Sequence, residues 1–397
     1  MKKLRVGVLF GGRSGEHEVS LLSAASVLKA IDKEKYDVVP IGITREGRWV
    51  TAAHAERLLA GRAPRTLRPS SLRAGDPQAT SAAAVLAKGE GVVVPPIPGE
   101  NHSALLPFET SNSELQAAHN PIDVDIIFPV LHGTFGEDGT IQGLLELADI
   151  PYVGAGVLGS AAGMDKDVMK RLFRDAGLPI VKHVTVLRSA WRNDPKRVRR
   201  QIESGLRYPV FVKPANLGSS VGISKVHGTS ELAAAMNEAA RYDRKLIVEQ
   251  GIGGKKSKAR EIECSVLGND DPIASVAGEI VPIKEFYDYN AKYLDKGSEL
   301  IIPAKLPAKK QNEVRRLAVA AFQAVDCAGL ARVDFLMDPR SGRMYVNEIN
   351  TIPGFTSISM YPKLWAASGI PYTELIDRLI QLGLERHADK KQNRYCR

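Results

Sequence analysis

Cysteine is scarce in this sequence: Cys264, Cys327 and Cys396 are the only ones in 397 residues, and none belongs to a Cys-x-x-Cys pair. This excludes a disulfide framework and a cysteine-based zinc site, and it is typical of a reduced cytoplasmic protein. Long apolar runs are also absent. The first one ends at Phe10, where residues 11–16 are glycine-rich instead of resembling a signal-peptide cleavage site. We therefore expect a cytoplasmic protein that has no membrane partner.

A continuous block of one charge sign is also lacking. Lys and Arg number 54 against 45 Asp and Glu, which gives a net charge of +9. The short basic runs at 255–260 and 386–397 are typical of a solvated loop and a flexible tail, so we expect no nucleic-acid partner. The positive excess favours anionic small molecules. The length and the 44% hydrophobic content predict a globular protein of two or three domains.

The first part of the chain alternates between expected strands, loops and helices. Strands are predicted at 4–10, 36–43 and 124–131, and a helix at 18–31. This alternation predicts an α/β domain built on a doubly wound parallel sheet. The intervening segment is rich in Ala, Arg, Pro and Ser. We interpret it as a variable insertion at 52–120 within an N-terminal domain at 1–155.

Two further domains are expected after a boundary near residues 151–156. A central domain at 156–249 has predicted strands at 208–213 and 246–249. A C-terminal domain at 250–385 begins with a glycine-rich hinge and contains predicted strands and a helix. The elements expected in it are strands at 261–267, 273–280, 331–337 and 344–350 and a helix at 313–325, followed by a basic flexible tail at 386–397.

The most informative of these elements are the strands at 331–337 and 344–350. The turn residues between them predict a hairpin. Because strand side chains alternate between faces, polar and apolar residues are expected to separate. We place Arg332, Asp334, Glu348 and Asn350 on one face, and Val333, Phe335, Val346 and Ile349 on the other.

This polar face predicts a metal site. Oxygen ligands without His or Cys suit magnesium, which typically binds one or two carboxylates together with substrate phosphates. The expected ligands are Asp334, Glu348 and Asn350. The alternative interpretation is a hairpin with a solvated polar face and no metal.

Three glycine-rich loops follow expected strands. In the loop at 213–222, glycines allow backbone N–H groups to approach phosphate oxygens, Lys213 brings a positive charge, and Ser219 and Ser220 add hydroxyl donors. Neither this loop nor the one at 11–15 matches a P-loop or a dinucleotide fingerprint. Gly-Ser loops are often only turns. In the loop at 132–143, His132 is a candidate polar contact, without an assigned role in proton transfer.

Aromatic residues concentrate at 286–293, which includes Lys292 and Tyr293. The segment has two interpretations. As a lid, it would cover anionic substrate groups and exclude water. Otherwise it is an aromatic-rich edge strand.

Together these motifs resemble the ATP-grasp superfamily and, within it, the D-alanine–D-alanine ligase family. The resemblance covers residues 4–384 except for 52–120. It implies a three-domain fold that is α+β in its ATP-binding half, with ATP held between the central and C-terminal domains. The most specific blocks lie at 132–139, 164–166, 213–220, 286–293 and 347–360.

The resemblance assigns the contacts of ATP and metal. It implies that Lys166 and Lys213 contact the phosphates. It places Glu249 by the adenine and Glu261 on the ribose hydroxyls, and it implies two magnesium or manganese ions on the hairpin. The ATP-binding residues are Lys166, Lys213, Ser219, Ser220, Glu249, Glu261 and Lys292, and the metal ligands are Asp334, Glu348 and Asn350.

Catalytic and substrate contacts are also implied. Glu16 matches the residue that binds the ammonium of the first D-alanine, and Ser219 and Tyr293 match its hydrogen-bonded partners. Arg332 and the N–H of Gly354 match the pair that stabilises an oxyanion. Ser359 and the backbone of Met360 match the clamp for the second carboxylate. The catalytic residues are Glu16, Ser219, Tyr293, Arg332 and Gly354, and the substrate-binding ones are Glu16, His132, Lys292, Tyr293, Ser359 and Met360.

The function implied is ATP-dependent ligation of two D-alanines through D-alanyl phosphate, for peptidoglycan synthesis, by a homodimer. One alternative is a ligase that takes D-serine or D-lactate second, although Tyr293 argues against D-lactate. Another is a regulator that binds nucleotide without catalysis. The sequence departs from the family pattern at Gln250, where many members have Lys, and in a longer connection at 253–260.

Overall fold

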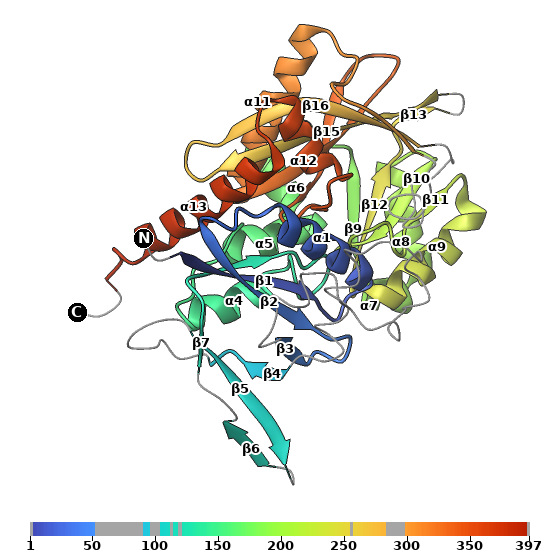
Figure 1. The fold of residues 1–397 in the computed structure, drawn as a ribbon. Helices are drawn as coiled ribbons and strands as arrows, with labels where there is room; N and C mark the ends of the chain where they lie inside the picture. Colours follow the sequence, from blue (N-terminus) through green and yellow to red (C-terminus); the bar gives the residue numbers. More distant parts are fainter. Residues whose placement is uncertain are drawn as a thin grey trace.

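The computed structural model describes residues 3–51, 90–95, 104–111, 114–117, 121–254, 257–282 and 298–394. The strands form an eight-stranded, a four-stranded and a five-stranded sheet, with a small two-stranded ribbon (Figure 1). The fold is therefore mixed α/β. Within the described residues, no helix is both long enough and apolar enough to cross a membrane.

The N-terminal sheet has the strand order β6-β5-β4-β3-β2-β1-β8, with β7 paired to β5. Its apolar side chains point to both faces, and helices cover both. α1 and α13 pack on one face and α4 on the other. The strands are β1 (Leu4–Gly11), β2 (Tyr36–Ile43), β3 (Trp49–Thr51), β4 (Glu90–Val93), β5 (Ala104–Ser111), β6 (Glu114–Ala117), β7 (Ile122–Asp123) and β8 (Ile126–Pro129), and the helices are α1 (His17–Ala30), α4 (Thr140–Leu147) and α13 (Tyr372–Lys390).

The expected parallel sheet is limited to three strands. β1 pairs in parallel with β2 and β8, whereas the pairs from β2 to β6 are antiparallel. The reason is visible between β2 and β3, where a tight turn closes with a 2.8 Å hydrogen bond from the Thr44 N–H to the Arg48 carbonyl. A connection this short reverses the chain and can only join antiparallel strands. Three strands, β4 to β6, come from the segment expected to be a variable insertion.

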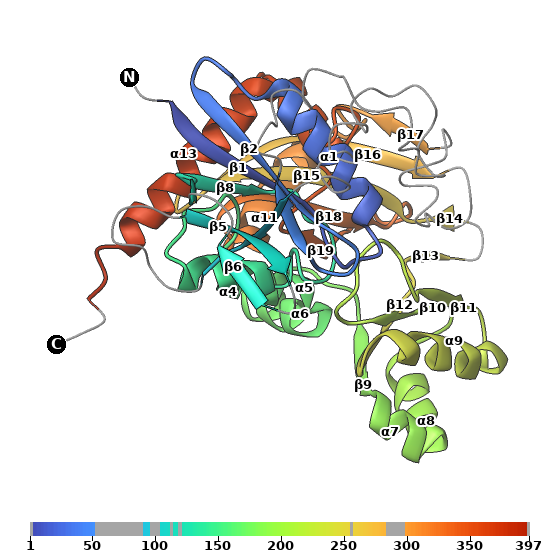
Figure 2. The same cartoon turned by 60° about the horizontal axis from the view of Figure 1, so that its bottom comes forward.

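The four-stranded sheet has the order β11-β10-β12-β9, with every pair antiparallel. α7, α8 and α9 lie beside it, and together they project from the rest of the molecule (Figure 2). The apolar residues of α8 and α9 pack with those of β10 and β12. The elements are β9 (His183–Leu187), α7 (Arg188–Asn193), α8 (Pro195–Gly205), β10 (Val210–Pro214), β11 (Ser224–Val226), α9 (Thr229–Tyr242) and β12 (Lys245–Gln250).

The five-stranded sheet has the order β17-β16-β15-β18-β19 and is also antiparallel. α6 and α11 pack with one face through a large apolar cluster. α12 packs through Met360 and Leu364 near β16. The elements are α5 (Val157–Met164), α6 (Lys166–Asp175), β13 (Gly253–Gly254), β14 (Ser257–Lys258), β15 (Arg260–Gly268), β16 (Ile273–Pro282), β17 (Ser298–Ile301), α11 (Ala308–Ala324), β18 (Gly329–Met337), β19 (Met344–Asn350) and α12 (Met360–Ala367).

The expected hairpin is present as β18 and β19, with one irregularity. Asp334 lies opposite Glu348, but the next pair is Phe335 with Val346, so Asn347 is an extra residue in β19. Such a bulge reverses the side-chain alternation. It explains how Val346 and Ile349, three residues apart, both reach the apolar cluster on α11. Strict alternation would have placed them on opposite faces.

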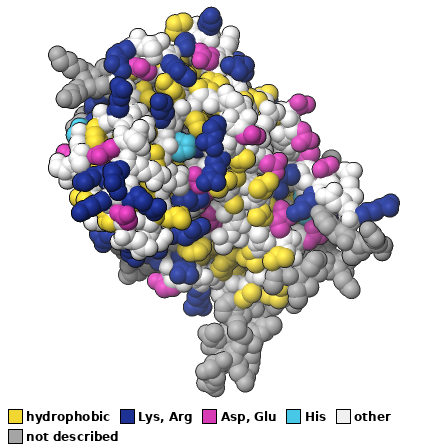
Figure 3. All heavy atoms as spheres, turned by 180° about the vertical axis from the view of Figure 1, so that it is seen from behind, with side chains coloured by type: hydrophobic (Ala, Val, Ile, Leu, Met, Phe, Trp, Pro, Cys, Tyr) yellow, Lys and Arg dark blue, Asp and Glu magenta, His cyan; other side chains and the backbone are white. Residues whose placement is uncertain are grey.

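Helix α13, near the C-terminal end of the chain, packs on the N-terminal sheet. It extends to Lys390, five residues into the segment expected to be a tail. Arg386 stacks over the Tyr152 ring at 4.2 Å, and both Arg386 and Lys390 pair with Glu146 of α4. The C-terminal helix is thereby fastened to the N-terminal sheet. On the face shown in Figure 3, basic side chains are interspersed with acidic and apolar ones.

Candidate active site

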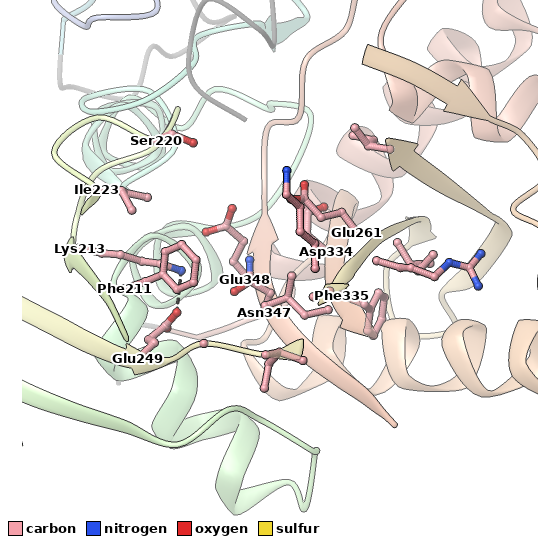
Figure 4. Close-up of a pocket in the computed structure, with 18 of the residues that line it drawn as sticks. Phe211, Lys213, Ser220, Ile223, Glu249, Glu261, Asp334, Phe335, Asn347 and Glu348 are labelled. Carbon is pink, nitrogen blue, oxygen red and sulfur yellow. Dashed lines mark ion pairs between the residues drawn. The ribbon is translucent and has the colours of Figure 1, made fainter. Parts of the chain in front are cut away.

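A pocket of about 400 Å³ lies between the four-stranded and five-stranded sheets. Residues from β10 and β12 form one wall, and residues from β15, β18 and β19 form the other. Figure 4 shows Lys213 and Glu249 on the first wall and Glu261, Asp334 and Glu348 on the second. Eight of the residues predicted from the sequence line it: Lys166, Lys213, Ser219, Ser220, Glu249, Glu261, Asp334 and Glu348.

The first wall carries a buried ion pair. Lys213 Nζ lies 2.6 Å from Glu249 Oε2, and both side chains are nearly inaccessible to solvent. Burial would raise the pKa of Glu249, but the ammonium groups of Lys170 and Lys213 hold it well below its usual range. Burial would lower the pKa of Lys213, and attraction to Glu249 and Glu348 raises it instead. Both groups are therefore charged at neutral pH.

A second lysine connects the two walls. Lys166 is the first residue of α6, a helix whose start is capped by the Asp165 carboxylate. Its Nζ donates to the Leu217 carbonyl at 2.8 Å and lies 3.5 Å from Glu348 Oε2. Its charge therefore lies between the glycine-serine loop and the polar face of the hairpin, where an anionic ligand would be stabilised.

The loop after β10 turns sharply at Ser219 and Ser220, whose φ angles are +52° and +59°. These left-handed conformations bring the loop back toward the N-terminal sheet. Ser219 Oγ donates a hydrogen bond to Glu16 Oε1, which is 203 residues away in sequence. Glu16 precedes α1 but makes no capping hydrogen bond with its side chain. Its carboxylate therefore interacts with another part of the fold instead of stabilising its own helix.

Two further buried groups lie near Glu16. Burial and the charge of Glu16 raise the pKa of Glu137 to about 8, although Glu137 accepts a 2.6 Å hydrogen bond from the Gly133 N–H. Burial lowers the pKa of His132, and Glu16 only partly offsets this. His132 is therefore neutral at pH 7. It lines a smaller pocket of about 210 Å³ at the ends of β1 and β8, not the larger one.

The hydrogen bonds of His132 fix its tautomer. Nδ1 lies 3.0 Å from the Ile352 carbonyl, which can only accept, so Nδ1 carries the proton. Nε2 then accepts from the Ser23 hydroxyl at 2.9 Å. This holds the loop after β19, which leads to Gly354, against the N-terminal sheet.

Arg332 on β18 does not line the pocket, but it forms a bidentate pair with Asp334, which does, with both contacts at 2.7 Å. Its Nε also lies 3.0 Å from Glu263 Oε2. Glu263, Asp334 and Glu348 occupy matching positions on three adjacent strands, because Glu263 is opposite Asp334 and Asp334 is opposite Glu348. The guanidinium is thus held by carboxylates on two strands.

The loop after β19 places Gly354 and Ser359 together. A Cβ on Gly354 would lie 3.2 Å from Ser359 Oγ, so a side chain there would press on Ser359. Ser359 precedes α12, and its hydroxyl lies 2.7 Å from that of Thr356. Met360 is buried at the start of α12 and packs in an apolar cluster. Lys292 and Tyr293 lie outside the described residues.

The donors on the hairpin suit a hard divalent cation. Asp334 and Glu348 lie side by side across β18 and β19, and Asn350 Nδ2 donates a hydrogen bond to Asp334 Oδ2 at 3.1 Å. In the described part of the chain, no group of three or more His, Cys, Asp or Glu side chains is arranged to hold a metal ion. Two carboxylates and an amide oxygen fit magnesium, which completes its coordination with phosphate oxygens and water.

Three residues near the site were not singled out in the sequence. Lys170 lies one helical turn after Lys166, and this spacing is a signal that both share a face of α6. Glu263 follows Glu261 by two residues on a strand, so a shared face was also predictable. Glu137 lies within the 132–139 block that carries the family resemblance, but no role was assigned to it from the sequence.

Two antiparallel sheets with a pocket between them, lysines on one wall and carboxylates on the other, form the arrangement expected of an ATP-grasp enzyme. Family models described as the N-terminus and C-terminus of D-ala D-ala ligase match residues 5–155 and 172–381. The chain belongs to the D-alanine–D-alanine ligase family.

Individual relatives cover almost the whole chain. A D-alanine–D-alanine ligase from Heliobacterium modesticaldum is 49% identical, over 99% of this chain and 98% of the relative. The solved D-alanine–D-alanine ligase from Coxiella burnetii is 36% identical with a TM-score of 0.80, covering 99% of this chain and 97% of that one. The VanG D-Ala:D-Ser ligase from Enterococcus faecalis is 36% identical with a TM-score of 0.79, covering 96% of this chain and all of the other.

Proposed function

We propose that this chain joins two D-alanine molecules in an ATP-dependent reaction that passes through D-alanyl phosphate and releases ADP and phosphate. Family membership carries the ligase activity. The structural observation that most supports the proposed site is the pocket between the two antiparallel sheets, lined by Lys166, Lys213, Asp334 and Glu348. The product dipeptide would serve peptidoglycan synthesis.

In the proposed first step, the carboxylate of one D-alanine attacks the γ-phosphate of ATP. Lys213 and Lys166 offset the negative charge of the phosphates, and the Ser219–Ser220 turn brings backbone N–H groups toward them. Asp334, Glu348 and Asn350 would hold magnesium or manganese, which neutralises phosphate charge when bound. Glu16, held by Ser219, would receive the ammonium of this D-alanine.

In the proposed second step, the amine of the other D-alanine attacks the acyl phosphate carbonyl, and phosphate leaves. Arg332 and the N–H of Gly354 would stabilise the oxyanion, and removing one such donor typically costs roughly 3–4 kcal/mol. Glu263 and Asp334 hold the Arg332 guanidinium in place. Ser359 and the Met360 N–H would bind the second carboxylate.

We also propose the three-domain division at 1–155, 156–249 and 250–385, with ATP between the second and third domains. The lid with Lys292 and Tyr293, the two metal ions and a homodimer belong to the same proposal. Sedimentation equilibrium of the purified protein tests the dimer. A mass that stays at one chain across micromolar concentrations would exclude it.

The test of the function is product identification. The purified protein is incubated with ATP, magnesium and D-alanine alone, or with added D-serine or D-lactate, and the products are separated by mass spectrometry. We expect D-alanyl-D-alanine and stoichiometric ADP. D-serine belongs in the assay because the D-Ala:D-Ser ligase matches this fold as well as the D-alanine–D-alanine ligase does. Predominant D-alanyl-D-serine would instead support that second function, and no ADP release with any substrate would support a regulator.

A further inference from the structure

Lys170 is a lysine with no exposed surface, which is an unusual position for a charged side chain. It lies on α6, behind the pocket, and does not line it. Its Nζ lies 2.9 Å from Glu249 Oε1 and donates to the Asn347 carbonyl at 3.0 Å. A buried ammonium is expensive unless it is paired, so these contacts account for its burial.

The two contacts of Lys170 reach both walls of the pocket. Glu249 lies on β12 of the four-stranded sheet, and Asn347 is the bulge residue of β19 in the five-stranded sheet. Asn347 directly precedes Glu348, the predicted metal ligand. Lys170 therefore fixes the spacing between the wall that carries Lys213 and the wall that carries Glu348.

Charge balance gives Lys170 a second effect. Glu249 is shared between Lys170 at 2.9 Å and Lys213 at 2.6 Å, so the buried group of two lysines and one glutamate has a net charge of +1 when all three are ionised. Burial lowers the pKa of Lys170, and the charge of Glu249 opposes this shift. Without Lys170, Glu249 and Lys213 would form a neutral pair. The pocket would then offer much less attraction to phosphate, because the low dielectric of a buried site makes each charge matter more.

We propose that Lys170 is a positioning residue for nucleotide binding: it engages one oxygen of Glu249, so that Lys213 keeps a net positive charge for the phosphates, and it braces the two walls. Lys170 does not touch the nucleotide in this proposal. The inference rests on the proposed function, because it takes the pocket to be the ATP site.

The test compares Lys170→Met with a matched control, Lys245→Met. Lys245 also pairs with carboxylates at the start of α6, at 2.7 Å from Asp165 and 3.4 Å from Asp167, but it does not line the pocket. Affinity for ADP with magnesium is measured by titration calorimetry, alongside the KM values of ATP and D-alanine. We expect Lys170→Met to weaken ADP binding at least tenfold and to raise the KM of ATP more than that of D-alanine. Lys245→Met should lower the thermal stability but leave the ADP affinity and both KM values unchanged.

A double variant tests whether Lys170 acts through Glu249. In Lys170→Met with Glu249→Gln, the neutral glutamine no longer cancels Lys213, so ADP affinity should recover relative to Lys170→Met. Lys170→Met keeps the neutral Lys213–Glu249 pair, whereas the double variant leaves the Lys213 ammonium without this carboxylate, so the folding of both is checked by thermal denaturation. The double variant is also compared with Glu249→Gln, which lacks the same carboxylate, and their ADP affinities should agree within about threefold.

The outcomes separate the inference from the proposed function. If the wild-type protein does not bind ADP, the nucleotide site itself is wrong. If it binds ADP and Lys170→Met binds equally well, or if Lys245→Met weakens binding to the same extent, Lys170 has no positioning role. A double variant that binds ADP far more weakly than Glu249→Gln would show that Lys170 does not act through Glu249.

Discussion

Replacing Ser219 with alanine should separate the binding of the first amino acid from the binding of ATP. The hydroxyl of Ser219 donates to Glu16, which is only 7% exposed. A hydrogen bond to a charged group typically contributes about 1.5–3 kcal/mol. At 1.36 kcal/mol per factor of ten, its loss should lower kcat/KM for D-alanine about 10- to 150-fold. The Glu16 carboxylate would no longer be held in place by this hydrogen bond.

The neighbouring serine provides a matched control. Ser219 and Ser220 have nearly the same backbone conformation, with φ of +52° and +59°, so both alanine substitutions impose similar backbone strain. Both residues line the pocket between the sheets. We expect Ser220→Ala to raise the KM of ATP and to leave the first D-alanine site unchanged.

The assay measures the rate of ADP release, first at varied D-alanine with saturating ATP and then at varied ATP with saturating D-alanine. The single variant Glu16→Gln and the double variant with both Glu16→Gln and Ser219→Ala complete a mutant cycle. The losses in kcat/KM caused by the two substitutions should be strongly non-additive. Equal effects of Ser219→Ala and Ser220→Ala on both substrates would refute the reasoning. So would additive losses in the cycle, because they would show that Ser219 and Glu16 act independently.

Three further variants test other parts of the site. Glu348→Gln should abolish most activity and weaken manganese binding, measured by electron paramagnetic resonance, without changing the melting temperature, because an amide is a poorer metal ligand; unchanged manganese affinity would contradict the assigned metal ligand. The pKa of Glu137 rises from 4.5 to about 8 on folding, so between these pH values the folded protein keeps a proton that the unfolded chain releases. The free energy of unfolding should therefore fall as the pH rises from about 4.5 to about 8. Glu137→Gln should remove that decline in urea unfolding between pH 5 and 8, and parallel curves for both proteins would contradict it. Tyr293→Phe should relax the preference for D-alanine over D-lactate, measured as the ratio of dipeptide to depsipeptide, and an unchanged ratio would exclude a role of this hydroxyl in selection.

Local patterns were enough to predict the elements that carry the site. β2 and β19 begin and end at the predicted residues. The ends of β15 and the start of β18 differ from the predicted positions by one or two residues. Each is a strand with a buried face, so its side-chain period is strong. The antiparallel part of the N-terminal sheet was not predicted, because β4, β5 and β6 lie in a segment whose composition resembles a surface loop.

Long-range electrostatics could not be predicted from local patterns. Lys170 has the appearance of an ordinary basic residue on an amphipathic helix, and only the fold shows that it is buried against Glu249. The bulge at Asn347 could not be predicted from the local pattern either. Strict alternation would have placed Val346 and Ile349 on opposite faces of β19. In both cases the tertiary contact overrides the local pattern, and the contact is made by a residue far away in sequence.

The contacts that assemble the site have a consequence for how its kinetics should be interpreted. Glu16 lies in the loop between β1 and α1, and Ser219 lies in the loop after β10 of the four-stranded sheet, while Lys170 joins that sheet to β19. The candidate amino-acid and nucleotide sites therefore share the loop that carries Ser219. A change that shifts this loop alters the position of Glu16 together with the N–H groups proposed to face the phosphates. An increase in the KM of one substrate is consequently not enough to assign a residue to that substrate, and only a matched neighbour or a mutant cycle can separate direct contact from a shift of the shared loop.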